Sequence, residues 1–169
     1  MGQEKGFVNH NGSPFISHIL EALSSITDQI LICTNQSEYG QFGYPCIPDE
    51  IPNCGPIGGI YTGLLHSKTE QNLVLSCDIP FINTPVLKNL IAQYSGKFDI
   101  THYTDNPLIG IYNKSIIASL RTSIYTRQLK LLALLSNLNV LKLPVSNEIA
   151  PLLKNINTMQ QYKQTVRWN

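Results

Sequence analysis

Charged side chains are scarce in this sequence, and the two signs nearly balance. Asp, Glu, Lys and Arg make up 14% of the 169 residues, with 12 basic and 11 acidic side chains and a formal net charge of +1. Nonspecific nucleic-acid binding needs a clustered excess of Lys and Arg. Neither a basic arm nor an acidic tail is present, so the composition argues against a nucleic-acid partner.

The sequence also lacks long hydrophobic runs. No apolar stretch approaches the ~20 residues of a membrane span, and residues 1–20 have neither the basic start nor the apolar block of a signal peptide. We therefore expect a cytoplasmic protein without a membrane partner. The four cysteines form no Cys-x-x-Cys pair and have no His at ligand spacing, which favours reduced thiols over a disulfide framework or a zinc site.

Short apolar segments alternate with amphipathic ones. Strands are predicted at 29–35, 44–48, 72–80, 98–103, 108–113 and 139–145. Helices are predicted at 15–26, 57–67, 84–95, 114–121, 126–136 and 158–166. This alternation is typical of an α/β fold with a mainly parallel sheet. We expect one antiparallel strand around "YTDNPLIG". We also expect Thr84 to cap the helix predicted over 84–95.

One acidic residue stands where an apolar strand is predicted to end. "NLVLSCDIPF" places Asp78 at the carboxyl end of the strand, where a carboxylate can hold Mg²⁺ beside a phosphate. The structural alternative is an Asx turn into the next helix, and on these residues alone it is favoured at roughly two to one. Asp78 is therefore the first candidate for a metal ligand, with the alternative still open.

A glycine-rich stretch, "CGPIGGIYTGL", begins a predicted helix at Gly55 and Pro56. Backbone N–H groups at a helix start attract anions, and glycines let a ligand approach the backbone. The alternative is an ordinary loop with close helix packing. The stretch is neither a Walker motif nor G-x-G-x-x-G, so it indicates phosphate binding only weakly. No motif for a covalent nucleophile is present.

Several single polar residues admit both a functional and a structural interpretation. Lys5, between two glycines, is placed to neutralise a pyrophosphate or simply to lie in water. Asn35, at the end of a predicted strand, either hydrogen-bonds a base or caps a turn, and Asp49, beside Pro48, either reaches a nucleotide or lies in water. Asn155 and Asn157, in "KNINTMQQY", suit recognition of a pterin or the start of a helix. For each of these residues taken alone, the structural interpretation is favoured over the functional one.

Taken in order, these pieces resemble one family. "MGQEKGFVNHNGSPFISHILEAL", "ICTN", "PDEIPNCGPIGGI", "LSCDIPFI", "NPLIGIY" and "NINT" are similar to successive blocks of the molybdenum cofactor guanylyltransferase family, also called molybdopterin-guanine dinucleotide biosynthesis protein A. The resemblance runs essentially end to end. It implies a single nucleotidyltransferase domain over 1–169, with a three-layer α/β/α fold and a Rossmann-like, mostly parallel sheet that has one antiparallel strand.

The resemblance also implies an activity and a site. The family is a transferase that joins GMP from GTP to molybdopterin and releases pyrophosphate. The implied nucleotide-binding residues are Lys5, Asn35, Asp49, Gly55, Pro56 and Asp78. Lys5 and Asp78 would be catalytic, with Lys5 on the phosphates of GTP and Asp78 holding Mg²⁺, while Asn155 and Asn157 would lie toward molybdopterin. Implied partners are GTP, molybdopterin, and proteins that deliver the cofactor or accept it as molybdoenzymes.

The sequence departs from the family at its beginning. The family has a strand and a Leu-x-Gly-Gly-x-Ser-x-Arg block before the lysine, and here only "MGQEKG" matches the end of that block. We therefore expect the first strand and the Gly-rich loop to be missing. That strand would lie between the strands ending at Asn35 and Asp78, so these two either close on each other or receive a strand from another chain.

Three functions remain open at this stage. The leading one is the guanylyltransferase, favoured by "NINT", with the activity of this exact chain in question because the loop is missing. The second is a molybdopterin cytidylyltransferase or another nucleotidyltransferase of the same fold. The third is a non-catalytic domain that binds a nucleotide or a pterin.

Overall fold

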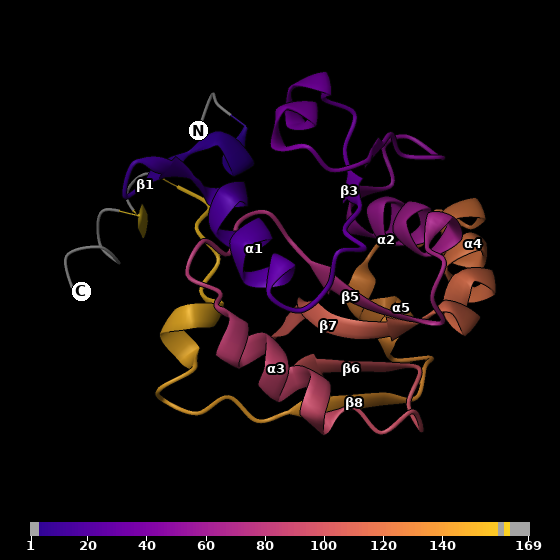
Figure 1. Ribbon diagram of the computed structural model, residues 1–169. Coiled ribbons are helices and arrows are strands. Elements are labelled where there is room, and N and C mark those ends of the chain that lie inside the picture. The colour runs from indigo at the N-terminus through magenta and orange to yellow at the C-terminus, as the bar shows by residue number, and fades with distance from the viewer. Residues whose placement is uncertain (1–3, 159–160, 163–169) are drawn as a thin grey trace.

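The computed structural model describes residues 4–158 and 161–162. Its main sheet has four strands in the order β5-β7-β6-β8 (Figure 1). These are β5 (Gln71–Leu75), β6 (Ile100–Tyr103), β7 (Asn106–Asn113) and β8 (Val140–Leu143). β7 is antiparallel to both neighbours, and β6 pairs with β8 in parallel. β7 is therefore the one reversed strand of this sheet, as predicted for the segment around "YTDNPLIG".

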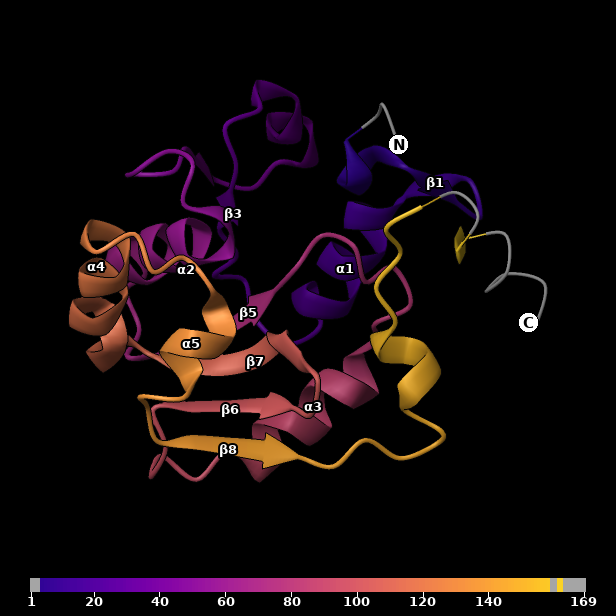
Figure 2. The ribbon, with the colours of Figure 1, turned by 180° about the vertical axis from the view of Figure 1, so that it is seen from behind.

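Helices cover both faces of the sheet, which makes the fold three-layered (Figures 1 and 2). The helices are α1 (Phe15–Ser24), α2 (Gly55–His66), α3 (Thr84–Gln93), α4 (Ile117–Tyr125) and α5 (Leu131–Leu135). One core packs α1 and α3 against strand residues such as Tyr103 and Ile109. The other packs α2, α4 and α5 against Ile100 and Tyr112. Neighbouring strand residues thus point into different cores, so apolar side chains run along the strands without a break.

A second, two-stranded sheet contains β3 (Ile32–Cys33), which pairs in parallel with β4 (Cys46–Ile47). Among the described residues, no strand pairing joins β3 to β5, and the two strands belong to different sheets. Of the two alternatives, the one in which these strands close on each other is therefore wrong. Each of them has a strand neighbour on one edge only, because nothing in the described part of the chain supplies backbone groups to the other edge.

The helix boundaries correct two predictions. The helix expected over 126–136 begins only at Leu131, because Arg127 has a left-handed backbone with φ of 58°. α3 is capped by Asn83, whose side chain accepts the amide of Val86 at 3.1 Å. The hydroxyl of Thr84, the expected cap, instead donates to the carbonyl of Ala22 at 3.1 Å. The predicted helix over 158–166 lies largely outside the described residues.

The N-terminal segment packs on the molecule through short elements that were not predicted. A 3-10 turn (Lys5–Phe7) precedes a small hairpin of β1 (Asn9–His10) and β2 (Ser13–Pro14). A second 3-10 segment (Ser37–Phe42) contains Tyr39, which is 3% exposed. A Cβ atom on Gly6 would overlap the hydroxyl of Tyr39, so the glycine is what lets these two segments approach each other.

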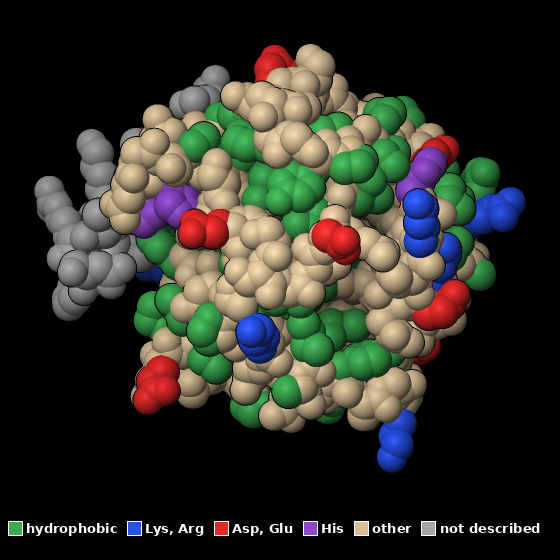
Figure 3. All heavy atoms as spheres, in the orientation of Figure 1, with side chains coloured by type: hydrophobic (Ala, Val, Ile, Leu, Met, Phe, Trp, Pro, Cys, Tyr) green, Lys and Arg blue, Asp and Glu red, His purple; other side chains and the backbone are tan. Residues whose placement is uncertain are grey.

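The surface agrees with the low charge of the sequence. On the face shown in Figure 3, acidic and basic side chains are spread out, and no patch of one sign dominates. All four cysteines are free thiols. Within the described residues, no helix combines the length and the apolar character needed to cross a membrane.

Candidate active site

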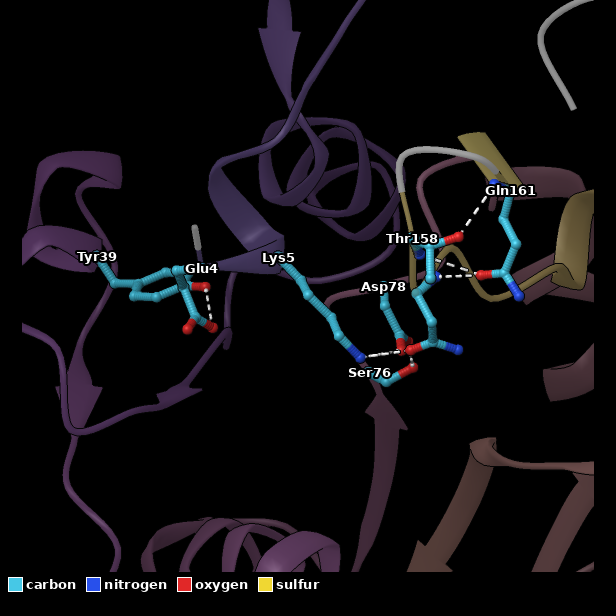
Figure 4. Close-up of polar contacts among 8 residues, drawn as sticks. Glu4, Lys5, Tyr39, Ser76, Asp78, Thr158 and Gln161 are labelled. Carbon is cyan, nitrogen blue, oxygen red and sulfur yellow. Dashed lines mark hydrogen bonds and ion pairs between the residues drawn. The ribbon is translucent and has the colours of Figure 1, made fainter. Parts of the chain in front are cut away.

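Lys5, Asp78 and Asn157 come together from three distant parts of the chain. Figure 4 shows the side chain of Lys5 pointing toward that of Asp78. Lys5 Nζ lies 3.5 Å from Asp78 Oδ2 and also donates to Asn157 Oδ1. Lys5 comes from the N-terminal 3-10 turn, Asp78 from the segment that follows β5, and Asn157 from the C-terminal loop. The Asp78 side chain is 13% exposed and that of Lys5 is 41% exposed. The structure thus unites three residues that the sequence singled out separately.

The carboxylate of Asp78 is also held by a residue that the sequence analysis missed. The hydroxyl of Ser76 donates to Asp78 Oδ1 at 2.7 Å, and the amide of Ser76 donates to the carbonyl of Leu108 on β7 at 3.1 Å. Ser76 is therefore fixed to the sheet and in turn orients Asp78, leaving Oδ2 on the side of Lys5. The available signal was its position two residues before Asp78 at the end of an extended segment.

The C-terminal loop is attached directly to the Asp78 segment. The amide of Ile156 donates to the carbonyl of Asp78 at 2.8 Å, and the side chain of Ile156 is fully buried. It packs in a small core with Val8 and Phe15. Asn155 and Asn157, on either side of Ile156, are both exposed. Of the two, Asn157 reaches Lys5.

A capping interaction fixes the backbone of Asn157. The carboxamide oxygen of Gln161 accepts the amides of Asn157 and Thr158 at 2.8 and 3.1 Å. The hydroxyl of Thr158 accepts the amide of Gln161 at 3.1 Å. This reciprocal arrangement is a capping box, with Thr158 as the cap and Gln161 three residues later. The sequence "TMQQ" contains the pattern, which the sequence analysis did not use.

Asn35 and Asp49, both predicted nucleotide ligands, contact each other. Asn35 Oδ1 accepts the amide of Asp49 at 3.1 Å. The carboxylate of Asp49 lies alongside the first turns of α2, 3.9 Å from where a Cβ of Gly58 would stand and 4.0 Å from that of Gly59. A Cβ at either position would be in ordinary contact with Asp49, whereas a Cβ on Gly58 would overlap the Cβ of Cys54, 2.9 Å away. The charge of Asp49 is favourable near a helix N-terminus.

Gly55 and Pro56 form the exposed beginning of α2. Asn53 and Gly55 both have left-handed backbones, with φ of 61° and 55°, so the chain turns sharply before the helix. Asparagine tolerates this left-handed conformation better than most residues that carry a Cβ. Among the described residues, no hydrogen bond or ion pair joins Gly55 or Pro56 to Lys5 or Asp78. A link from the Lys5 turn instead reaches the segment after β3, where Gln36 donates to Glu4 at 2.9 Å.

The thiols near these residues are protonated at neutral pH. Burial, followed by the charge of Asp78, raises the pKa of Cys77 to about 11. Burial, followed by the charge of Asp49, raises the pKa of Cys33 to about 11. Without a bound metal, these thiols therefore carry no negative charge at neutral pH. Within the described ranges no group of three or more His, Cys, Asp or Glu side chains is arranged to hold a metal.

The oxygen groups around Asp78 suit a magnesium ion. Mg²⁺ binds through one or two carboxylates plus substrate phosphates and keeps several waters, rather than filling an all-protein cage. A single oriented carboxylate, exposed enough to admit a substrate, fits that pattern. A zinc or calcium site, by contrast, needs more protein ligands than Asp78 and its neighbours supply.

A family model for the MobA-like NTP transferase domain matches residues 1–139. The chain belongs to this family. It is 44% identical over 140 residues to a probable molybdenum cofactor guanylyltransferase of Flavobacterium johnsoniae, a match that covers 80% of this chain and 74% of that protein. It is 29% identical over 170 residues to the molybdenum cofactor guanylyltransferase of Vibrio parahaemolyticus, covering 96% and 86%.

Solved structures show the same fold as this MobA-like domain. Molybdopterin-guanine dinucleotide biosynthesis protein A of Archaeoglobus fulgidus superposes with a TM-score of 0.81 at 26% identity, covering 97% of this chain and 89% of that one. A nucleotidyl transferase of Methanothermobacter thermautotrophicus gives 0.73 at 15% identity, covering 98% and 86%, and shows the fold alone. The family predicted from the sequence and the nucleotidyltransferase fold are both confirmed.

Proposed function

We propose that this MobA-like domain transfers GMP from GTP to molybdopterin and releases pyrophosphate. The observation that carries the proposal is the meeting of Lys5 and Asp78 beside β5 in a chain closely related to proteins named molybdenum cofactor guanylyltransferase. Mg²⁺ is the proposed cofactor, and GTP and molybdopterin are the proposed partners. The reaction is proposed to take place in the cytoplasm, with proteins that deliver molybdopterin or accept the product as further partners.

The chemistry of nucleotidyl transfer agrees with what the site offers. The attacking group is already a phosphate oxygen, so the reaction needs in-line positioning and charge neutralisation rather than a strong general base. Mg²⁺ held by Asp78 would supply Lewis-acid stabilisation of the reacting phosphates. The ammonium of Lys5 would move from Asp78 to the phosphates and balance the charge that develops on pyrophosphate. Ser76 would keep the Asp78 carboxylate oriented throughout.

We place the nucleotide between the Lys5 turn and the loops that follow β3 and β4. In α/β sheets ligands bind at the carboxyl ends of parallel strands, and Asn35 and Asp49 follow such ends. Gly55 and Pro56 would border this space at the start of α2. The exposed Asn155 would face molybdopterin. The whole chain is proposed to act as one nucleotidyltransferase domain.

The test is nucleotide turnover by the purified chain with molybdopterin. We expect pyrophosphate release with GTP that is at least tenfold faster than with CTP at equal concentration. Faster turnover of CTP would identify a cytidylyltransferase and overturn the guanylyl assignment. Binding of GTP without pyrophosphate release, in the presence of Mg²⁺ and molybdopterin, would identify a non-catalytic binding domain and overturn the proposed activity.

A further inference from the structure

The two residues that flank Lys5 in the chain both contact one buried hydroxyl group. The hydroxyl of Tyr39 donates to Glu4 Oε1 at 3.3 Å, and its oxygen accepts a backbone hydrogen bond from Gly6. A phenolic hydroxyl both donates and accepts, so it can bind the two neighbours at once. Figure 4 shows the Lys5 side chain pointing away from the Glu4–Tyr39 pair and toward Asp78.

The Tyr39 hydroxyl is itself held in place by packing. Tyr39 is 3% exposed and lies in a small core with Ile16 and Leu20 of α1. The centroid of its ring is 4.7 Å from that of Phe7, at the end of the N-terminal 3-10 turn. Burial raises the pKa of Tyr39, so the hydroxyl keeps the proton that it donates. The hydroxyl is therefore a fixed point to which this turn is attached.

Glu4 is attached to the same part of the chain by both oxygens of its carboxylate. Oε1 accepts from Tyr39, and Oε2 accepts the side-chain amide of Gln36 at 2.9 Å. The turn that follows Glu4 (Lys5–Phe7) is only three residues long, and 3-10 hydrogen bonds have poorer geometry than those of an α-helix. Contacts at the flanks of the turn therefore contribute to where it stands.

We propose that Tyr39 is a positioning residue for Lys5: its hydroxyl holds the N-terminal turn where the Lys5 ammonium reaches Asp78 and the phosphates of the bound nucleotide. The inference rests on the GMP transfer proposed above. Tyr39 acts only through Lys5, without touching the reacting atoms. Because a misplacement of about 1 Å can cost about 100-fold in rate, one hydroxyl outside the reacting centre is enough to change turnover.

The first experiment compares GMP transfer by the unsubstituted chain with that by Tyr39→Phe, which keeps the buried ring and removes only the hydroxyl. We expect kcat to fall by about tenfold or more with a smaller change in the KM for GTP, because Lys5 acts on charge that develops in the transition state. Tyr44→Phe is the matched control. Tyr44 packs against the same core, and among the described residues no hydrogen bond involves its hydroxyl, so kcat should be unchanged.

A second comparison separates positioning from a general loss of structure. In a Lys5→Met chain, the group that Tyr39 is proposed to position is gone. Adding Tyr39→Phe to Lys5→Met should therefore slow transfer no further, whereas two independent effects on the rate would multiply.

The position of Lys5 is also measured without the reaction. Sulfosuccinimidyl acetate acetylates lysine side chains, and peptide mass spectrometry gives the rate at each of them. In the unsubstituted chain Lys5 Nζ is engaged by Asp78 and Asn157. Once Tyr39→Phe loosens the turn, Lys5 should react several-fold faster. Lys88, exposed on α3, should react at the same rate in both chains, and circular dichroism establishes that each variant is folded.

The proposal is overturned by a kcat of Tyr39→Phe equal to that of the unsubstituted chain, or by unchanged acetylation of Lys5. It is also overturned if Tyr39→Phe slows the Lys5→Met chain as much as it slows the unsubstituted one, or if Tyr44→Phe causes the same loss. If the unsubstituted chain releases no pyrophosphate from GTP, the proposed reaction is wrong, and the acetylation rates alone decide whether Tyr39 positions Lys5.

Discussion

The amide of Ile156 donates a 2.8 Å hydrogen bond to the carbonyl of Asp78, and the Ile156 side chain is completely buried. This one residue joins the C-terminal loop to the segment after β5. The loop carries Asn157, and the segment carries Asp78, so the two polar side chains meet because Ile156 is seated between them. The packing of an apolar residue thus sets the geometry of the polar site.

Shortening Ile156 should therefore weaken both the fold and the activity. Ile156→Ala is expected to lower the free energy of unfolding by about 2–5 kcal/mol, and Ile156→Val by about 0.5–1.5 kcal/mol, as for other buried isoleucines. Urea unfolding measures this loss. At temperatures where each variant remains folded, GMP transfer should fall in the same order. Unchanged stability in Ile156→Ala would show that the loop is not anchored by this side chain.

The contact of Gly6 with Tyr39 gives a second stability prediction. Gly6→Ala should lower the free energy of unfolding by about 1–3 kcal/mol, because the new Cβ would overlap the buried Tyr39 hydroxyl. Gly40→Ala is the matched control, since a Cβ there meets no atom within 4 Å. Adding Tyr39→Phe to Gly6→Ala should recover part of the loss. Equal urea midpoints for Gly6→Ala and Gly40→Ala would contradict this account.

Alkaline pH should destabilise the protein. Burial raises the pKa of the Cys33 and Cys77 thiols from 9.0 to about 11 in the folded state. The folded protein therefore holds these protons more tightly than the unfolded chain, and the stability they contribute is complete below pH 9 and lost as pH rises toward 11. Unfolding free energies measured across this range should fall, and the double variant Cys33→Ala/Cys77→Ala should fall less steeply. Parallel pH curves would rule out this cause.

β3 and β5 each have one edge without a strand neighbour in the described part of the chain, and this predicts the effect of adding a strand. The residues of β6 are all buried, whereas those of β5 are half-buried or exposed, although β5 contains Leu73 and Leu75. Unpaired apolar edges promote aggregation. Extending the chain upstream with an apolar strand and a Gly-Gly loop should raise the melting temperature, reduce light scattering and increase GMP transfer.

The control for this extension has the same length but carries two prolines in its strand, which prevents pairing within a sheet. It should behave like the unextended chain. If both extensions change the melting temperature and the transfer rate equally, strand pairing is not the reason.

The sequence alone identified most of the individual site residues, but it did not predict which of them contact one another. Asp78 was found because an apolar run ends beside it, and β7 because its neighbour lies so close in the chain. Ser76 was missed, since a lone serine has no signature until its hydroxyl is seen on Asp78. The contact of Lys5 with Asn157 joins the two ends of the chain, and only tertiary packing brings such distant residues together.

The sequence predicted two helix starts incorrectly, because interactions that a local pattern does not reveal decided where these helices begin. Thr84 and Asn83 are both good caps, and the choice was made by Ala22, whose carbonyl takes the Thr84 hydroxyl. The left-handed backbone of Arg127 ends a helix that its hydrophobic pattern would have continued. The sequence alone identified the family correctly, because several short blocks in a fixed order carry more information than any single block.

The most direct test of the proposed reaction uses GTP labelled at its α-phosphorus, with molybdopterin and Mg²⁺. The unsubstituted chain should transfer the label to molybdopterin. Asp78→Asn should lose at least about 100-fold in rate while remaining folded, because the charge that holds the metal is removed. Asp28→Asn, an exposed carboxylate far along the chain, should retain full activity. Label transfer by Asp78→Asn at the rate of the unsubstituted chain would contradict the account.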